Sequence, residues 1–311
     1  MRKPLASALT DSIRRIKLSK FRVFQYSTGA ELSKRNLKAE QMLHRTKLLS
    51  LSVLLCVSWS PASPNSGVRD SQKTFVLIHG SWHSAWNWYK VTPILEKRGH
   101  RVLAPDLPAM GRDKTPVQEV EFDKTVDQLC QMIDAVEGQV VLVGHSKNGV
   151  LISQVAEKRP HKVEKLVYLA AVLAKNGKSA VDYFKLDEGE ILGPHITYDS
   201  ATNSSRLLPA IYREGLYHDC EEEITDMANI ILSDEPRQTA THPIAVTEKN
   251  WGSVPRYYIE CTEDRAITPP LQQRMYREIP CEKVYQLNSS HSPFFSMPEA
   301  LVDILIDIAK K

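Results

Sequence analysis

Short apolar runs alternate with longer stretches of helical periodicity from Lys73 to the end of the chain. The runs show little polar alternation, which is typical of strands buried on both faces of a parallel sheet; they read "TFVLIH", "HRVLAPDL", "QVVLVGH", "VEKLVYLAA", "VPRYYIE" and "EKVYQL". Apolar residues at three- and four-residue intervals lie between them and predict helices, as in Phe122, Val126, Leu129 and Ile133. The pattern therefore predicts an α/β fold: a mostly parallel sheet of about six strands flanked by helices.

One long stretch breaks this alternation after the fourth predicted strand. Residues 174–250 are polar, mixed in charge and short in apolar runs. We therefore predict a catalytic domain over residues 73–311 that carries an inserted cap at about residues 174–250.

Residues 1–72 differ in character from the rest of the chain. Met1–Lys47 hold 12 Lys and Arg against 3 Asp and Glu, and the apolar stretch "LLSLSVLLCVSW" and a Pro/Ser-rich linker follow. A basic segment, about a dozen apolar residues and small residues after them are typical of a signal peptide, and the stretch is short for a membrane span. We predict export to the periplasm or medium without stable membrane insertion of the mature domain. A cytoplasmic or membrane-anchored protein, or one with an organelle-type presequence, is the alternative.

Composition narrows the classes of partner. The chain has 311 residues, of which 42% are hydrophobic, enough for a large core. Its net charge of +3 comes from the leader, because the residues after Lys47 hold 28 Lys and Arg against 34 Asp and Glu. A nucleic-acid binder needs a basic face on its folded part, so we expect a small-molecule partner and no nucleic acid. A homodimer is compatible with this composition.

The chain has no motif with metal-ligand spacing. His79 and His83 are four residues apart, but Gly80 between them favours a loop, and no carboxylate or cysteine completes a site. The cysteines after the leader are far apart in sequence and fit buried free thiols: Cys130, Cys220, Cys261 and Cys281. We expect neither a metal nor a cofactor.

The stretch "VVLVGHSKNGVL" places Ser146 directly after a predicted buried strand and before a helix. Carboxyl ends of parallel strands open onto a crevice, where reactive groups are placed. Gly144 permits the sharp turn that exposes a serine hydroxyl. The usual Gly-x-Ser-x-Gly pattern is imperfect, since Asn148 occupies its last position and glycine follows at Gly149. We expect the turn to persist, because Asn tolerates unusual backbone angles.

A serine nucleophile needs a base, and the base needs an acid that orients it. In this topology they follow in the order Ser, Asp or Glu, His, each after a later strand. Asp264 follows "VPRYYIE" and His291 follows "EKVYQL". Glu263 is a substitute for the acid, and Glu260 a weaker one.

Backbone amides after the first strand and after the nucleophile are placed to form an oxyanion hole. The turn "HGSW" and the nucleophile turn point to the amides of Ser81 and Lys147. We expect an apolar substrate pocket with some polar lining, for which the candidates are Gly80, Trp82, His145 and Phe294.

The segments "FVLIHGSWHSAWNWYKVTPILEKRGHRVLAPDL", "GHSKNG", "YHDC", "YIECTEDRAI" and "SSHSPFF" resemble α/β-hydrolases of the group containing plant methylesterases and hydroxynitrile lyases, with their bacterial esterase-like relatives. The resemblance covers about residues 73–311. It implies that Ser146, Asp264 and His291 form a catalytic triad, that the insertion caps the pocket, and that the catalytic domain opens at "TFVLIH".

The resemblance leaves two activities to separate. The lyases of this group carry a threonine where this chain has Gly80, and after the catalytic histidine a lysine that stabilises the cyanide leaving group, where this chain has Ser292. We expect Gly80 to leave room beside Ser146 for an acyl group, and the Lys147 side chain to point away from the pocket. Hydrolysis of small carboxylic esters through an acyl-enzyme is therefore predicted, with methyl esters of aromatic or alicyclic acids as candidate substrates. The alternatives are a lyase and a slow-turnover ligand-binding receptor.

Overall fold

The computed structural model describes residues 72–311. The predicted signal-peptide-like leader lies outside the described residues. No helix of the described part is long and apolar enough to cross a membrane.

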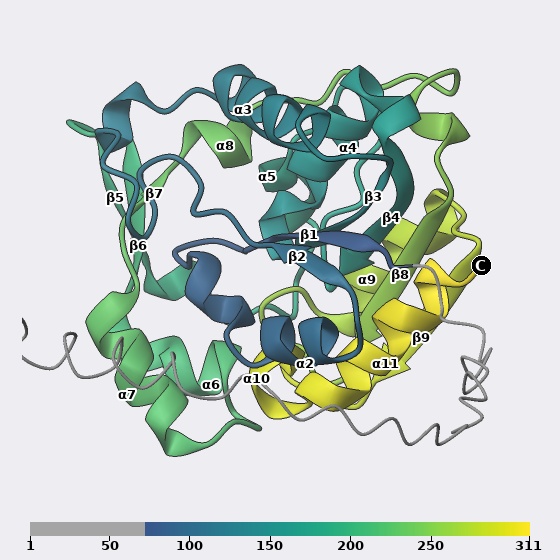
Figure 1. Cartoon of the computed structure of the whole chain (residues 1–311). Helices are drawn as coiled ribbons and strands as arrows, with labels where there is room; N and C mark the ends of the chain where they lie inside the picture. Colours follow the sequence, from purple (N-terminus) through teal and green to yellow (C-terminus); the bar gives the residue numbers. More distant parts are fainter. Residues whose placement is uncertain (1–71) are drawn as a thin grey trace, which may run out of the picture. The chain divides into compact units, whose positions relative to one another are not determined.

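A six-stranded sheet forms the centre of the described part, and every neighbouring pair of its strands is parallel (Figure 1). This confirms the predicted fold class. The strand order is β2-β1-β3-β4-β8-β9. Each strand coincides with one of the six predicted apolar runs, and β8 alone extends one residue beyond its run: β1 Thr74–Ile78, β2 Arg101–Leu103, β3 Val140–His145, β4 Val163–Leu169, β8 Arg256–Cys261 and β9 Lys283–Leu287.

Helices cover both faces of the sheet, which explains the continuous apolar runs of the central strands. Val76 and Ile78 of β1 belong to the core on the face that α3, α4 and α9 cover, whereas Phe75 and Leu77 belong to the core on the other face, which α2, α10 and α11 cover. The bounds of these helices are α2 Val91–Lys97, α3 Phe122–Asp134, α4 Gly149–Lys158, α9 Pro269–Glu278, α10 Pro293–Ser296 and α11 Pro298–Ala309. The expected helix before β2 is split, because a 3₁₀ turn, Ala85–Trp88, precedes α2.

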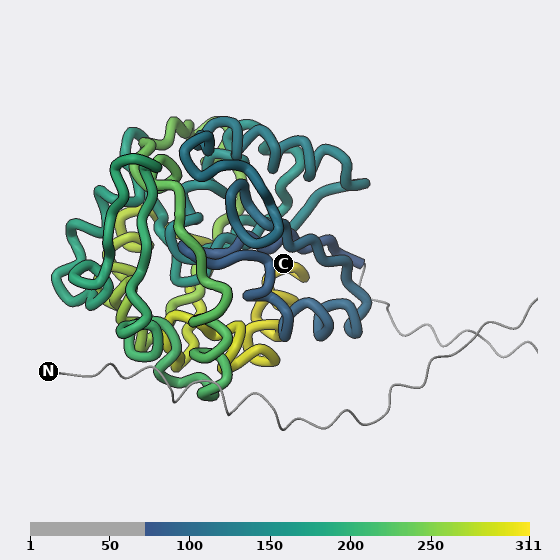
Figure 2. Tube along the Cα trace, turned by 90° about the vertical axis from the view of Figure 1, so that its left-hand side faces the viewer, coloured from purple at the N-terminus to yellow at the C-terminus, as the bar shows by residue number. Residues whose placement is uncertain are grey.

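The chain between β4 and β8 forms a cap of short elements that includes an antiparallel sheet, β5-β6-β7. The cap sheet and α7 lie on the left in Figure 1, and Figure 2 looks at the molecule from that side. The helices and strands of the cap are α5 Ala180–Phe184, β5 Ile196–Asp199, β6 Ser204–Leu207, α6 Tyr212–Leu216, α7 Glu222–Ile231, β7 Glu235–Pro236 and α8 Gln238–Thr241.

Candidate active site

Ser146 occupies a strained turn between β3 and α4. Its φ is 58°, in the left-handed region that non-glycine residues rarely adopt. Two hydrogen bonds hold the turn: the Val172 amide donates to the Ser146 carbonyl (2.9 Å), and the Asn148 side-chain amide donates to the His79 carbonyl (2.6 Å). Strain held in place by surrounding bonds is typical of functional sites.

The glycine that this turn requires is Gly149. A Cβ there would lie 2.2 Å from the Val172 carbonyl oxygen, so no side chain fits between α4 and the segment after β4. Asn148 has an ordinary φ of −76°, and its side chain is used as a donor. The turn therefore persists, but tolerance of Asn for unusual angles is not the reason. The strained angle belongs to Ser146 itself.

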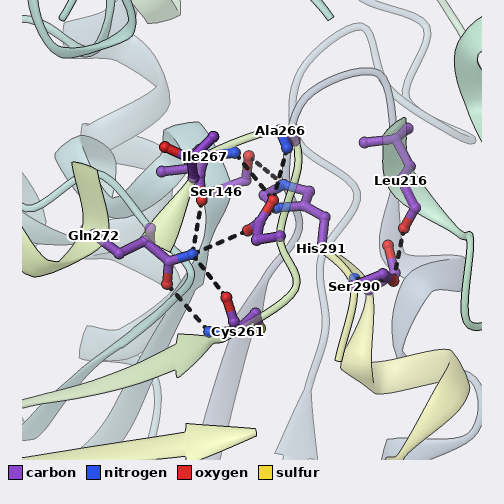
Figure 3. A network of polar contacts seen from close by, with 12 residues as sticks. Ser146, Leu216, Cys261, Ala266, Ile267, Gln272, Ser290 and His291 are labelled. Carbon is purple, nitrogen blue, oxygen red and sulfur yellow. Dashed lines mark hydrogen bonds and ion pairs between the residues drawn. The ribbon is translucent and has the colours of Figure 1, made fainter. Parts of the chain in front are cut away.

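Three buried side chains from separate loops meet at Ser146 (Figure 3). His291 Nε2 lies 2.9 Å from Ser146 Oγ, and His291 Nδ1 lies 2.6 Å from Asp264 Oδ2. A carboxylate only accepts, so Nδ1 carries the proton of the neutral ring and Nε2 is free to accept the serine proton. The arrangement can activate a hydroxyl and hold the resulting imidazolium.

Asp264 is the carboxylate that contacts His291, and the two substitutes lie elsewhere. Its Oδ1 accepts the amides of Ala266 (2.8 Å) and Ile267 (3.0 Å). Glu263 is exposed at the surface. Glu260 is buried away from this site, where its carboxylate accepts from the side chains of Gln273, Tyr276 and Gln286.

Gln272 is part of this network, although we did not predict it. It is fully buried, and its Nε2 donates to the Ile267 carbonyl (2.7 Å) and lies 3.3 Å from Asp264 Oδ2. Its Oε1 accepts the Cys261 amide (3.2 Å), so the glutamine ties the end of β8 to the acid loop (Figure 3). The sequence signal for a buried polar contact at Gln272 is its position between Leu271 and Met275 on a helix face that is otherwise apolar.

Three further histidines surround the site, and all are neutral. Burial lowers the pKa of His79 to about 4 and that of His83 to about 3, and it holds the pKa of His145 well below its usual range. His83 Nδ1 lies 2.6 Å from the Ser81 carbonyl, which only accepts, so Nδ1 carries the proton. His83 Nε2 then accepts the hydroxyl proton of Tyr217.

A cavity of about 350 Å³ opens over Ser146 between the sheet and the cap. Most of its lining is apolar, with Ser146, His145 and His291 at one end. The apolar lining comes mainly from the cap and the acid loop: Trp82, Val181, Phe184, Leu192, Ile196, Leu216, Ala266 and Ile267.

Of the predicted pocket residues, Trp82 and His145 line this cavity, whereas Gly80 and Phe294 do not. A Cβ at Gly80 would lie 2.6 Å from His145 Nδ1 and 2.9 Å from Ser146 Cβ. The expectation that Gly80 leaves room for an acyl group is therefore wrong, because these two side chains fill that space. Phe294 is fully buried in an aromatic cluster with Trp88 and His145.

Lys147 points away from the main cavity, as expected, and its side chain is buried in an ion pair. Its Nζ contacts Glu235 of β7 and lies 2.5 Å from Thr239 Oγ1 of α8. Only 3% of the Lys147 side chain and 7% of the Glu235 side chain are exposed. Lys147 thus joins the nucleophile turn to the cap.

Residues 72–311 hold no group of three His, Cys, Asp or Glu that could bind a metal ion. The four cysteines of the described part are free thiols.

The chain belongs to the alpha/beta hydrolase family, whose model matches residues 75–304. It is 33% identical to putative methylesterase 11, chloroplastic, of Arabidopsis thaliana, over 79% of this chain and 67% of that protein. It is 32% identical to methylesterase 17 of the same plant, over 76% of this chain and 91% of that protein. It spans 56% of the length of putative methylesterase 13, chloroplastic, at 31% identity.

Solved structures of esterases share the fold of this chain. The crystal structure of polyneuridine aldehyde esterase is 27% identical, with a TM-score of 0.70 over 76% of this chain and 99% of that chain. A pyrethroid hydrolase is 28% identical, with a TM-score of 0.67 over 76% of this chain and 97% of that chain. These similarities confirm the resemblance to methylesterases and related esterases.

Proposed function

We propose that this protein is a carboxylic ester hydrolase that works through an acyl-enzyme on Ser146. The observation that carries the proposal is the unbroken chain of contacts from Asp264 through His291 to the Ser146 hydroxyl, at the end of an apolar cavity. The esterase relatives support the reaction class.

In the first half-reaction Ser146 Oγ attacks the ester carbonyl carbon while His291 Nε2 takes the hydroxyl proton. Asp264 stabilises the imidazolium, and its own position is fixed by the amides of Ala266 and Ile267. The tetrahedral intermediate then expels the alcohol, which receives the proton from His291. Water attacks the acyl-enzyme in the same way and releases the acid.

The amides of Ser81 and Lys147 are the proposed donors to the negative oxygen of the intermediate. Ser81 lines the cavity, and Lys147 follows the nucleophile directly. The Ser81 carbonyl is held by His83, and the Lys147 side chain is held by Glu235. Both loops are thus fixed by side chains before substrate binds, which is what a preorganised donor pair requires.

The cavity favours an apolar ester. Most of its lining away from Ser146 is apolar, although Lys185, Glu190 and Tyr198 of the cap also line it, and a volume of about 350 Å³ is at the lower end of the range for small-molecule sites. Methyl esters of aromatic or alicyclic acids fit this lining, with the ring against Trp82, Leu192 and Ile267.

The arrangement favours hydrolysis over the lyase alternative. Ser292, at the position where the lyases have a lysine, is fully buried and carries no charge. Lys147, the cation nearest to the nucleophile in the sequence, points away from the main cavity and is paired with Glu235. A lyase would need a cation near the leaving cyanide, so neither residue serves that reaction.

A panel of methyl, ethyl and aryl esters tests the proposal, with mandelonitrile as the lyase substrate. We expect hydrolysis of apolar esters by the wild type, none above background by Ser146→Ala, and no cyanide release above the buffer rate. Cyanide release that Lys147→Ala abolishes, together with no ester hydrolysis, would move the function to the lyase side. Ligand binding without any turnover would favour the receptor alternative.

The leader is proposed to be a removable targeting segment, with the mature protein beginning after about residue 60. Mass spectrometry of the native N-terminus tests this. Intact Met1 in a soluble cytosolic fraction would contradict export.

A further inference from the structure

Four consecutive residues of the cap, Leu216–Asp219, contact three of the four loops that carry the proposed catalytic groups: the loop after β1, the acid loop and the base loop. We call these residues the bridging segment. They include the beginning of the "YHDC" motif, to which the proposed chemistry gives no role.

The first contact runs to the loop after β1. Tyr217 is fully buried, and its hydroxyl donates to His83 Nε2. His83 in turn donates from Nδ1 to the Ser81 carbonyl (2.6 Å). Burial raises the pKa of Tyr217 well above its usual value, and burial lowers that of His83 to about 3, so the donor and acceptor roles are fixed. Tyr217 therefore holds, through His83, the residue proposed to stabilise the oxyanion.

The other contacts run to the acid and base loops. His218 Nε2 donates to the carbonyl of Glu263, the neighbour of Asp264 (3.0 Å). Asp219 Oδ2 accepts the amide of Ser290, the neighbour of His291 (2.9 Å).

Ser290 is held from both ends of the bridging segment. Its amide donates to Asp219, and its hydroxyl donates to the Leu216 carbonyl (3.1 Å; Figure 3). The backbone just before the catalytic histidine is thus bonded to the cap at two points.

We propose that the bridging segment is a positioning element, which sets the spacing of the loop after β1, the acid loop and the base loop from the cap side. The inference rests on the proposed function for the roles of the loops. Its physical basis is that catalytic groups must be held within a few tenths of an ångström, and displacement by about 1 Å costs up to roughly 100-fold in rate. The cap would then contribute to the chemical step as well as to substrate binding.

Two single variants test the bridging segment, one at its contact with the loop after β1 and one at its contact with the base loop. Tyr217→Phe removes the donor to His83, and Asp219→Ala removes the acceptor of the Ser290 amide. We expect each to lower kcat about 10-fold, with KM within about twofold, because neither side chain lines the cavity. Asp219→Asn keeps an oxygen acceptor for the same amide, so we expect it to retain kcat within about twofold.

Tyr212→Phe is the matched control. Tyr212 is also a buried cap tyrosine, but its hydroxyl donates to the Leu207 carbonyl inside the cap (3.1 Å). The Tyr212→Phe variant loses a tyrosine hydroxyl, as Tyr217→Phe does, but this hydroxyl has no hydrogen bond to a catalytic loop. We expect it to keep kcat near the wild-type value, whatever it does to the melting temperature.

Amide hydrogen exchange gives a readout that does not require activity. We expect exchange to rise about 10-fold near residues 81–84 in Tyr217→Phe and at Ser290 in Asp219→Ala, with no change at either place in Tyr212→Phe. If the wild type hydrolyses esters and both variants keep its kcat and its exchange, the bridging segment does not position the loops. An equal loss of kcat in the Tyr212→Phe control would also overturn the proposal. If the wild type hydrolyses no ester, the proposed function fails, and the exchange pattern alone then decides whether the segment holds these loops.

Discussion

Removing either partner of the Lys147–Glu235 ion pair should destabilise the protein far more than removing a surface charge. The pair joins the residue after the nucleophile to β7 of the cap, and both side chains are almost fully excluded from water. Water therefore cannot solvate the charge that remains when one partner is lost.

The magnitude follows from this burial. Breaking a buried pair by removing one partner costs about 3–5 kcal/mol, whereas exposed pairs contribute roughly 0–1 kcal/mol. Each kcal/mol shifts the melting temperature of a domain of this size by about 2–4 °C. Glu235→Leu should therefore lower the melting temperature by roughly 10 °C. Replacing both partners, Lys147→Met with Glu235→Leu, leaves no buried charge and should restore most of the loss.

Urea denaturation of the wild type, the two single variants and the double variant completes a double-mutant cycle. Lys124→Met is the control, because Lys124 pairs with Glu121 at the exposed surface of α3. We expect a change of less than about 1 kcal/mol for this control. If Glu235→Leu costs no more than Lys124→Met, or if the double variant is as unstable as the two single losses combined, the assigned role of the ion pair is wrong.

Three further outcomes follow from the structure. Gly149→Ala should lower the free energy of unfolding, measured by urea denaturation, by about 3 kcal/mol or more, because its Cβ would overlap the Val172 carbonyl. Asn148→Gly should lower it by only about 1 kcal/mol, because one hydrogen bond is lost. Burial depresses the pKa of His79 to about 4, that of His83 to about 3 and that of His145 well below its usual range, so below about pH 6.5 the unfolded state binds more protons than the folded state. The free energy of unfolding should therefore fall by roughly 3–4 kcal/mol between pH 7 and 5.5, and His79→Gln should remove about a third of that loss. Reducing agent should leave the melting temperature unchanged, because the four cysteines of the described residues are free thiols; a drop on reduction would reveal a disulfide.

The sheet and the order of its strands along the chain were predictable, because a parallel sheet buried on both faces imposes uninterrupted apolar runs. Ser146, Asp264 and His291 were predictable for a related reason. Each lies directly after such a run, and strand ends meet at one edge of the sheet. Local pattern and topology are sufficient for groups placed in this way.

The contacts made by the cap were not predictable from pattern. The Lys147–Glu235 pair joins residues 88 positions apart, and nothing in "SKNG" indicates where the lysine finds its partner. The packing around Gly80 is a similar case. Its sequence position suggested an open space, but the close approach of His145, set by long-range packing, fills it. Such features depend on how the cap and the sheet meet, and no local periodicity encodes that.

The most direct test of the central claim is the mass of the protein during turnover of a nitrophenyl ester, quenched in acid within the first turnovers. We predict a species heavier than the free protein by the acyl group in place of one hydrogen, with the added mass on the peptide that contains Ser146. Ser146→Ala should carry no added mass and should not turn over. Acylation at another residue, or steady hydrolysis by Ser146→Ala, would contradict the account.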